Sequence, residues 1–111
     1  HRAAEQAFSA GASEYEIHLA YCRAAGAREE ELPYNNIIGF DRHAAVLHYQ
    51  VLDRHRPPGV KSFLIDAGAQ YAGYACDITR TYAAGTGEFL DLIRSLDAAQ
   101  QRLAGRVRPG V

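Results

Sequence analysis

The sequence has no methionine, no tryptophan and only two cysteines among its 111 residues. Two cysteines without the spacing of a metal site or a disulfide framework fit a reducing compartment, so we expect a cytoplasmic protein. No apolar run approaches the roughly 20 residues of a membrane span. A net charge of −1 argues against a nucleic acid or a membrane surface as the main partner. A chain that starts at His1 rather than methionine is expected to be a piece of a longer protein.

The residues that are present fit one small globular domain of the α+β class. Apolar residues make up 48% of the chain and charged residues 23%, which is enough to build a modest core. No internal repeat or low-complexity segment divides the sequence. We expect helices packed on one face of a curved, mainly antiparallel sheet.

Three helices are predicted. Residues 1–10 form the first, and Ser13 and Glu16 form an S-x-x-E capping box that starts the second. Gly26 ends the second helix. Glu88 begins the third. The apolar positions of the third helix, which we expect to be buried, are Phe89, Leu92, Ile93, Leu96, Ala99 and Leu103.

Two short strands are predicted between the second and third helices, over residues 36–40 and 45–51, with a loop at 41–43. His48 lies inside the second of these strands, after the apolar Val46 and Leu47. An interior strand histidine is more often a hydrogen-bonded core residue than a catalytic group. The pattern alone therefore leaves the role of His48 open.

Residues 62–82 read as a β-hairpin. The first strand begins at Phe63 and the second covers residues 74–82, with Gly68 and Gly73 flanking the turn. Each strand carries one aspartate, Asp66 and Asp77. Aspartate is a poor strand residue and is costly to bury alone, so this pair needs an explanation.

The eleven-residue spacing of the aspartates offers one. If the hairpin turns at Tyr71 and Ala72, Asp66 lies opposite Asp77, on a face shared with Thr79. Two facing carboxylates repel each other unless one is protonated or a divalent cation binds both. A shift of one residue in the pairing would place the aspartates on opposite faces. Simpler roles also stay open, since Asp66 could cap the turn and Asp77 could pair with a nearby arginine.

Two segments carry a family resemblance. IDAGAQYAGYACDITRTY, residues 65–82, resembles the metal-binding hairpin of the pita-bread metallopeptidases, which include methionine aminopeptidase, aminopeptidase P and prolidase. With ELPYNNIIGFDRHAAVLHY at residues 31–49, the chain is most similar to the bacterial Xaa-Pro dipeptidase (prolidase) group. The resemblance runs through residues 1–111.

The resemblance implies part of a pita-bread fold, with residues 1–111 as the N-terminal half of its catalytic domain. It also implies hydrolysis of Xaa-Pro dipeptides at the bond before a C-terminal proline, by a water activated between two divalent ions, manganese in typical prolidases. Asp66 would chelate one ion, Asp77 would bridge both, and His48 would contact the substrate. Thr79 is then a candidate partner of a ligand carboxylate.

The resemblance also limits what the chain can do alone. The family site uses two aspartates, one histidine and two glutamates, and only the two aspartates match within residues 1–111. We therefore expect the isolated chain to be inactive. The resemblance also implies that the whole protein is a homodimer. Two alternatives stay open: an aminopeptidase P that acts on longer peptides, and a pita-bread domain that binds without metal.

Overall fold

The computed structural model describes residues 1–110 as a mixture of helices and antiparallel strands. This outcome confirms the expected mixed class. The elements in chain order are α1 (Arg2–Ser9), α2 (Glu14–Ala25), the 3-10 helix η1 (Glu29–Glu31), β1 (Ile37–Phe40), the 3-10 helix η2 (Asp41–Ala45), β2 (Ser62–Ala67), β3 (Gln70–Tyr71), β4 (Tyr74–Ala75), β5 (Ile78–Ala83) and α3 (Glu88–Ala104). No helix within residues 1–110 is both long enough and apolar enough to cross a bilayer.

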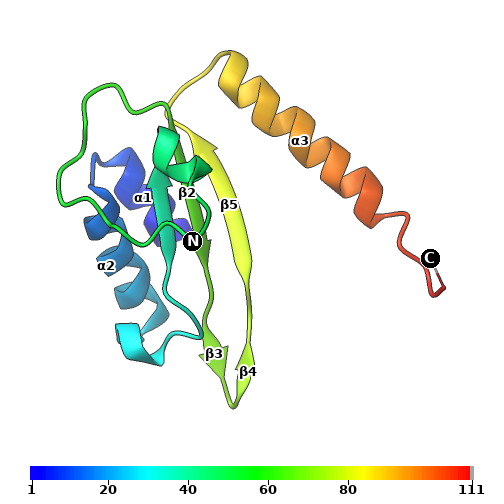
Figure 1. The fold of residues 1–111 in the computed structure, drawn as a ribbon, viewed down its shortest axis with the longest axis horizontal. Coiled ribbons are helices and arrows are strands. Elements are labelled where there is room, and N and C mark those ends of the chain that lie inside the picture. The colour runs from blue at the N-terminus through cyan, green and yellow to red at the C-terminus, as the bar shows by residue number, and fades with distance from the viewer. Residues whose placement is uncertain (111) are drawn as a thin grey trace.

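The main sheet has three antiparallel strands in the order β1-β2-β5, so β2 is central. Beyond it, β3 and β4 pair as the narrow end of the β2–β5 hairpin. Helices α1 and α2 lie together on one side of the sheet, whereas α3 projects away from it on the other side (Figure 1).

The first two helices form where the sequence predicts them. The Ser13 side chain accepts a hydrogen bond from the Glu16 backbone, and the Glu16 carboxylate accepts one from the Ser13 backbone at 2.8 Å. This reciprocal pair satisfies amides that the first turn of α2 leaves free. Gly26 ends the helix with a φ of 65°, a left-handed conformation that glycine adopts without steric cost.

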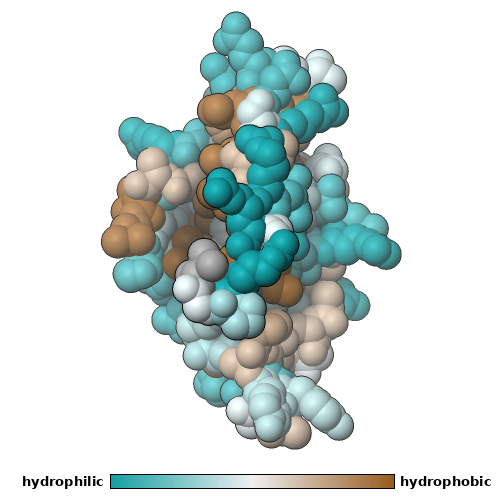
Figure 2. Space-filling model, turned by 90° about the vertical axis from the view of Figure 1, so that its right-hand side faces the viewer, coloured by the Kyte–Doolittle hydropathy of each residue, from teal (hydrophilic) through white to brown (hydrophobic). Residues whose placement is uncertain are grey.

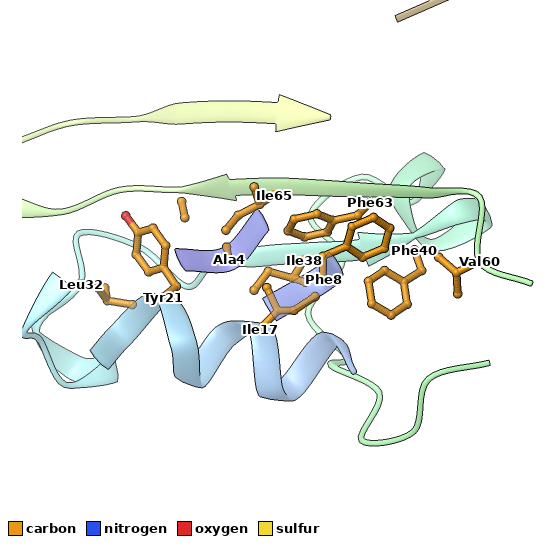
Figure 3. Packing of buried hydrophobic residues seen from close by; sticks show 11 residues of the cluster. Ala4, Phe8, Ile17, Tyr21, Leu32, Ile38, Phe40, Val60, Phe63 and Ile65 are labelled. Atoms are coloured by element: carbon orange, nitrogen blue, oxygen red, sulfur yellow. The ribbon is translucent and has the colours of Figure 1, made fainter. Parts of the chain in front are cut away.

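The core lies between these two helices and the sheet (Figure 3). Alternation along β2 turns Phe63, Ile65 and Ala67 towards the helices, and all three are fully buried. The ring of Phe63 stacks on Phe8 from α1, with centroids 5.0 Å apart. Burial of each large apolar side chain contributes about 1.5–3 kcal/mol, so this layer holds α1, α2 and the sheet together.

The predicted strand over residues 45–51 is wrong. The chain forms η2 directly after β1 and then a turn, in which His48 has a φ of 54°. The glycine at position 39 allows this path, because a Cβ there would lie only 2.8 Å from the backbone nitrogen of Ala44. The close approach folds the chain back over β1 instead of extending it into another strand.

The expected burial of the third helix is also wrong. Helix α3 begins at Glu88 as predicted, with Gly87 as its N-cap, but none of its residues is buried. Leu92 and Leu96 are 61% and 69% exposed. Hydrophobic surface lies beside hydrophilic surface on the side from which α3 projects (Figure 2). Within residues 1–110, α3 packs mainly against β5, and no element covers its apolar face.

Candidate metal centre

Asp66 lies on the face of the sheet that points away from the helices. Because side chains alternate along β2, the residues on either side of it, Ile65 and Ala67, enter the core. Asp66 itself is half-buried. The apolar neighbours therefore fix the strand and hold the carboxylate at the opposite surface.

Asp77 comes directly before β5 and is exposed. The register differs from the one expected. Asp66 pairs with Thr79 rather than with Asp77, because the hairpin turns at Ala72 and Gly73 rather than at Tyr71 and Ala72. Since the shift is two residues, it leaves every side chain on its expected face.

The two carboxylates converge on one atom. The Tyr34 hydroxyl donates to Asp66 Oδ1 at 2.8 Å and to Asp77 Oδ1 at 2.9 Å. A phenol carries one proton, so it donates to one carboxylate at a time while its oxygen stays beside both. The predicted sharing of one side of the hairpin is confirmed, and the predicted direct opposition is wrong.

Tyr34 is the residue that the sequence analysis missed. Burial, and then its hydrogen bonds to Asp66 and Asp77, raise the pKa of the Tyr34 phenol well above its usual range. The hydroxyl therefore stays protonated and remains a donor near neutral pH. The only sequence signal was an aromatic residue after Pro33, in a stretch that reads as a turn.

Gly68 makes this arrangement possible. A Cβ at this position would overlap the carbonyl oxygen of Cys76 and would lie 2.9 Å from Cε1 of Tyr34. The Cys76 amide donates to the carbonyl of Ala69 at 2.9 Å, which keeps the two sides of the hairpin paired beside Asp77. The missing side chain thus lets the Tyr34 ring and the Asp77 segment meet.

The other predicted site residues occupy different positions. Thr79 lies directly across from Asp66 on the same face, next to the carboxylate it was expected to support. His48 is exposed, in the turn after η2. Among the hydrogen bonds and ion pairs of residues 1–110, none joins His48 to Asp66 or Asp77. Its predicted contact with a substrate stays a prediction.

The donor set at Asp66 and Asp77 suits a hard divalent cation. Carboxylate oxygens are ligands preferred by magnesium, calcium and manganese, and a cation would remove the repulsion between the two groups. In the described part of the chain, no third histidine, cysteine or carboxylate joins this pair. The residues therefore fit a divalent metal but supply only part of its coordination.

A second cluster of possible ligands has a different character. Glu14, His43 and Asp53 place one ligand atom each within 4.8 Å of one another. Both oxygens of Glu14 already accept hydrogen bonds from the protein. A cation there would have to displace these donors, so we assign this cluster no metal.

Comparison with known proteins shows which protein family the whole chain matches. The chain matches the metallopeptidase family M24 over residues 1–111. It is 59% identical over 111 residues to a protein named Xaa-Pro dipeptidase from Stenotrophomonas maltophilia (strain K279a), covering 99% of this chain and 25% of the relative. An Xaa-Pro dipeptidase from Xanthomonas campestris pv. campestris (strain B100) is 60% identical over 112 residues, with 100% and 25% covered. The chain thus spans about a quarter of the length of these curated relatives. With the match covering all of its residues, the chain belongs to metallopeptidase family M24.

Proposed function

We propose that a whole protein containing this chain is an Xaa-Pro dipeptidase, which hydrolyses the bond before a C-terminal proline. One observation carries the proposal: the carboxylates of Asp66 and Asp77 converge on the Tyr34 hydroxyl, in a chain 59% identical to proteins of that name. In this proposal residues 1–111 form the N-terminal half of a pita-bread catalytic domain.

Asp66 and Asp77 would hold divalent metal, and we propose two ions, manganese in the working enzyme. When bound, such ions lower the pKa of a water and polarise a carbonyl. The protein's own contribution is to fix the ligand oxygens. The strand β2 fixes Asp66 through its buried neighbours, and Thr79 across the hairpin is placed to orient a ligand carboxylate.

His48 would bind the substrate. A neutral imidazole near the scissile carbonyl can donate a hydrogen bond to the oxygen as negative charge develops there. Its exposure leaves the ring free to meet a dipeptide. We further propose a cytoplasmic homodimer, on the grounds of family resemblance and cysteine content.

A direct test replaces the matching quarter of the Stenotrophomonas maltophilia relative with this chain and assays the resulting chimera. We expect manganese-dependent cleavage of a dipeptide with C-terminal proline and little cleavage of tripeptides with proline second. Faster cleavage of the tripeptides would identify an aminopeptidase P instead. A folded chimera that cleaves neither peptide would favour a binding module.

The isolated 111-residue chain provides the matching control. Two carboxylates supply few of the about six donors that manganese prefers, so water would fill most positions. We expect weak manganese binding by calorimetry and no dipeptide cleavage. Submicromolar binding by the isolated chain would show that it holds more ligands than we assign.

A further inference from the structure

Glu14 is a buried carboxylate that the proposed chemistry does not use. Its side chain is fully buried in the first turn of α2. The neighbouring Glu16 makes the capping box, so Glu14 is free to point into the protein. Burial of a carboxylate costs free energy unless several hydrogen-bond donors satisfy it, so we expect Glu14 to have specific partners.

Four donors satisfy the Glu14 carboxylate. Its Oε1 accepts hydrogen bonds from the Phe40 backbone N–H and from His43 Nδ1, both at 2.8 Å. Its Oε2 accepts hydrogen bonds from the Tyr49 hydroxyl at 3.1 Å and from the Asp53 backbone N–H at 2.9 Å. All four donors come from one segment, residues 40–53, which starts at the last residue of β1 and after it forms only the short helix η2.

The segment 40–53 therefore folds around one carboxylate. The His43 and Tyr49 rings stack on each other with centroids 4.5 Å apart, which joins its beginning and end. The Tyr15 amide of α2 also donates to the carbonyl of Asp53 at 3.1 Å. His48 precedes Tyr49 and has a φ of 54°, a left-handed conformation that is uncommon for a non-glycine residue and that the surrounding structure stabilises here.

We infer that Glu14 is a positioning residue, which sets the conformation of residues 40–53 and thereby the placement of His48 towards the substrate. This inference rests on the proposed role of His48. Glu14 does not touch substrate or metal in this account. Its loss should weaken catalysis through His48 and leave the metal ligands on the hairpin in place.

The first test uses the 111-residue chain and Glu14→Gln. A glutamine amide keeps one acceptor oxygen and turns an NH₂ group towards two of the four donors, so two bonds are lost. By NMR we expect faster exchange of the Phe40 and Asp53 amides, an altered ¹⁵N shift of His43 Nδ1 and displaced His48 resonances. Glu16→Gln, two residues away and exposed, keeps its capping box and should leave these signals unchanged. Unchanged His48 and His43 signals in Glu14→Gln would overturn the inference.

The second test is a double-mutant cycle in the chimeric dipeptidase. We expect Glu14→Gln to lower kcat/KM by on the order of 10-fold at unchanged metal content. In a protein that already carries His48→Ala, we expect Glu14→Gln to lower kcat/KM only slightly further. An equal loss in the His48→Ala background, or loss of metal, would show a general structural role and contradict the inference. If Glu14→Gln does not fold, Tyr49→Phe removes one donor and keeps the stacked ring, and the same cycle applies with a smaller loss.

The two tests separate the inference from the proposed function. A folded wild-type chimera without dipeptidase activity would refute the proposed function, and with it the catalytic part of the inference. The NMR comparison would still decide whether Glu14 sets the conformation of His48.

Discussion

Tyr34 joins residues that are 32 and 43 positions away in the sequence, through a single hydroxyl group. The phenol stays neutral, because burial and two neighbouring carboxylates disfavour its ionised form. Its hydroxyl proton therefore carries the partial positive charge that lies beside the carboxylate oxygens of Asp66 and Asp77.

Replacing Tyr34 by phenylalanine should destabilise the isolated chain by about 1 kcal/mol, because both carboxylates lose their shared donor. Urea unfolding of the 111-residue chain measures the loss. Tyr71→Phe is the matched control, since Tyr71 is 87% exposed at the end of the hairpin. Equal stability of the two variants would show that the Tyr34 hydroxyl contributes nothing.

Gly68→Ala tests the close packing beside the same site. The added methyl group must displace the Cys76 carbonyl or the Tyr34 ring, so we expect a loss of about 1–3 kcal/mol in the free energy of unfolding. Gly85→Ala meets no atom within 4 Å and should have a much smaller effect. A Gly68→Ala chain as stable as Gly85→Ala, with the Tyr34 resonances unmoved, would contradict this packing.

The proximity of Asp66 and Asp77 was predictable from sequence, whereas their shared partner Tyr34 was not. Asp66 and Asp77 stand out because aspartate disrupts a strand pattern, and side-chain alternation keeps them on one side even though the register differs by two residues. Tyr34 lies in an irregular stretch with no periodicity to indicate where its side chain points. Only the three-dimensional path of the chain brings it to the hairpin.

At the scale of elements, the turn decides the register of the hairpin. Ala72 and Gly73 both have positive φ, at 50° and 81°, as a two-residue loop of the type I′ class requires. Alanine is disfavoured in this conformation, whereas asparagine is common there. The turn lies one residue later than expected, because Gly73 takes the second left-handed position without steric cost.

Ala72→Asn should therefore stabilise the end of the hairpin, by about 0.5–1 kcal/mol. Hydrogen exchange of the Cys76 amide, which is bonded to Ala69, reports on this end of the hairpin. We expect slower exchange in Ala72→Asn and no slowing in Ala75→Asn, which lies in β4 outside the turn. Exchange that is faster in Ala72→Asn would contradict the turn assignment.

The segment 40–53 shows why local patterns fail elsewhere. A strand is expected over residues 45–51, but donors within and on both sides of that stretch bond instead to the carboxylate of Glu14 on α2. Tertiary hydrogen bonds thus override strand propensity. The helices at 1–10 and 13–26 were predicted well because their caps and periodicity are local.

Helix α3 has the expected start and periodicity but not the expected burial. We predict that Leu96→Ala changes the stability of the isolated chain by less than about 0.5 kcal/mol, since Leu96 is 69% exposed. Ile17→Ala in the core should cost about 2–5 kcal/mol, because Ile17 is fully buried. Thermal or urea unfolding compares the two, and a large loss in Leu96→Ala would show that α3 packs more tightly than described.

At the scale of the whole molecule, residues 1–110 form a core of helices and sheet and carry two candidate metal ligands on one hairpin. Two helices and three strands enclose a core, and the hairpin presents Asp66 and Asp77 on the opposite face. The chain covers about a quarter of its curated relatives, and the apolar face of α3 has no cover within residues 1–110. Both facts accord with the proposed function, in which residues 1–111 form one half of a catalytic domain.

The most direct test of the central claim is the metal content of the purified chimeric dipeptidase and its aspartate variants, by mass spectrometry. The account predicts about two ions per chain in the unmodified chimera and in Asp97→Asn, which alters an exposed aspartate on α3. It predicts loss of at least one ion in Asp66→Asn and a greater loss in Asp77→Asn. If both hairpin variants fold and keep as much metal as Asp97→Asn, Asp66 and Asp77 are not metal ligands and the account is wrong.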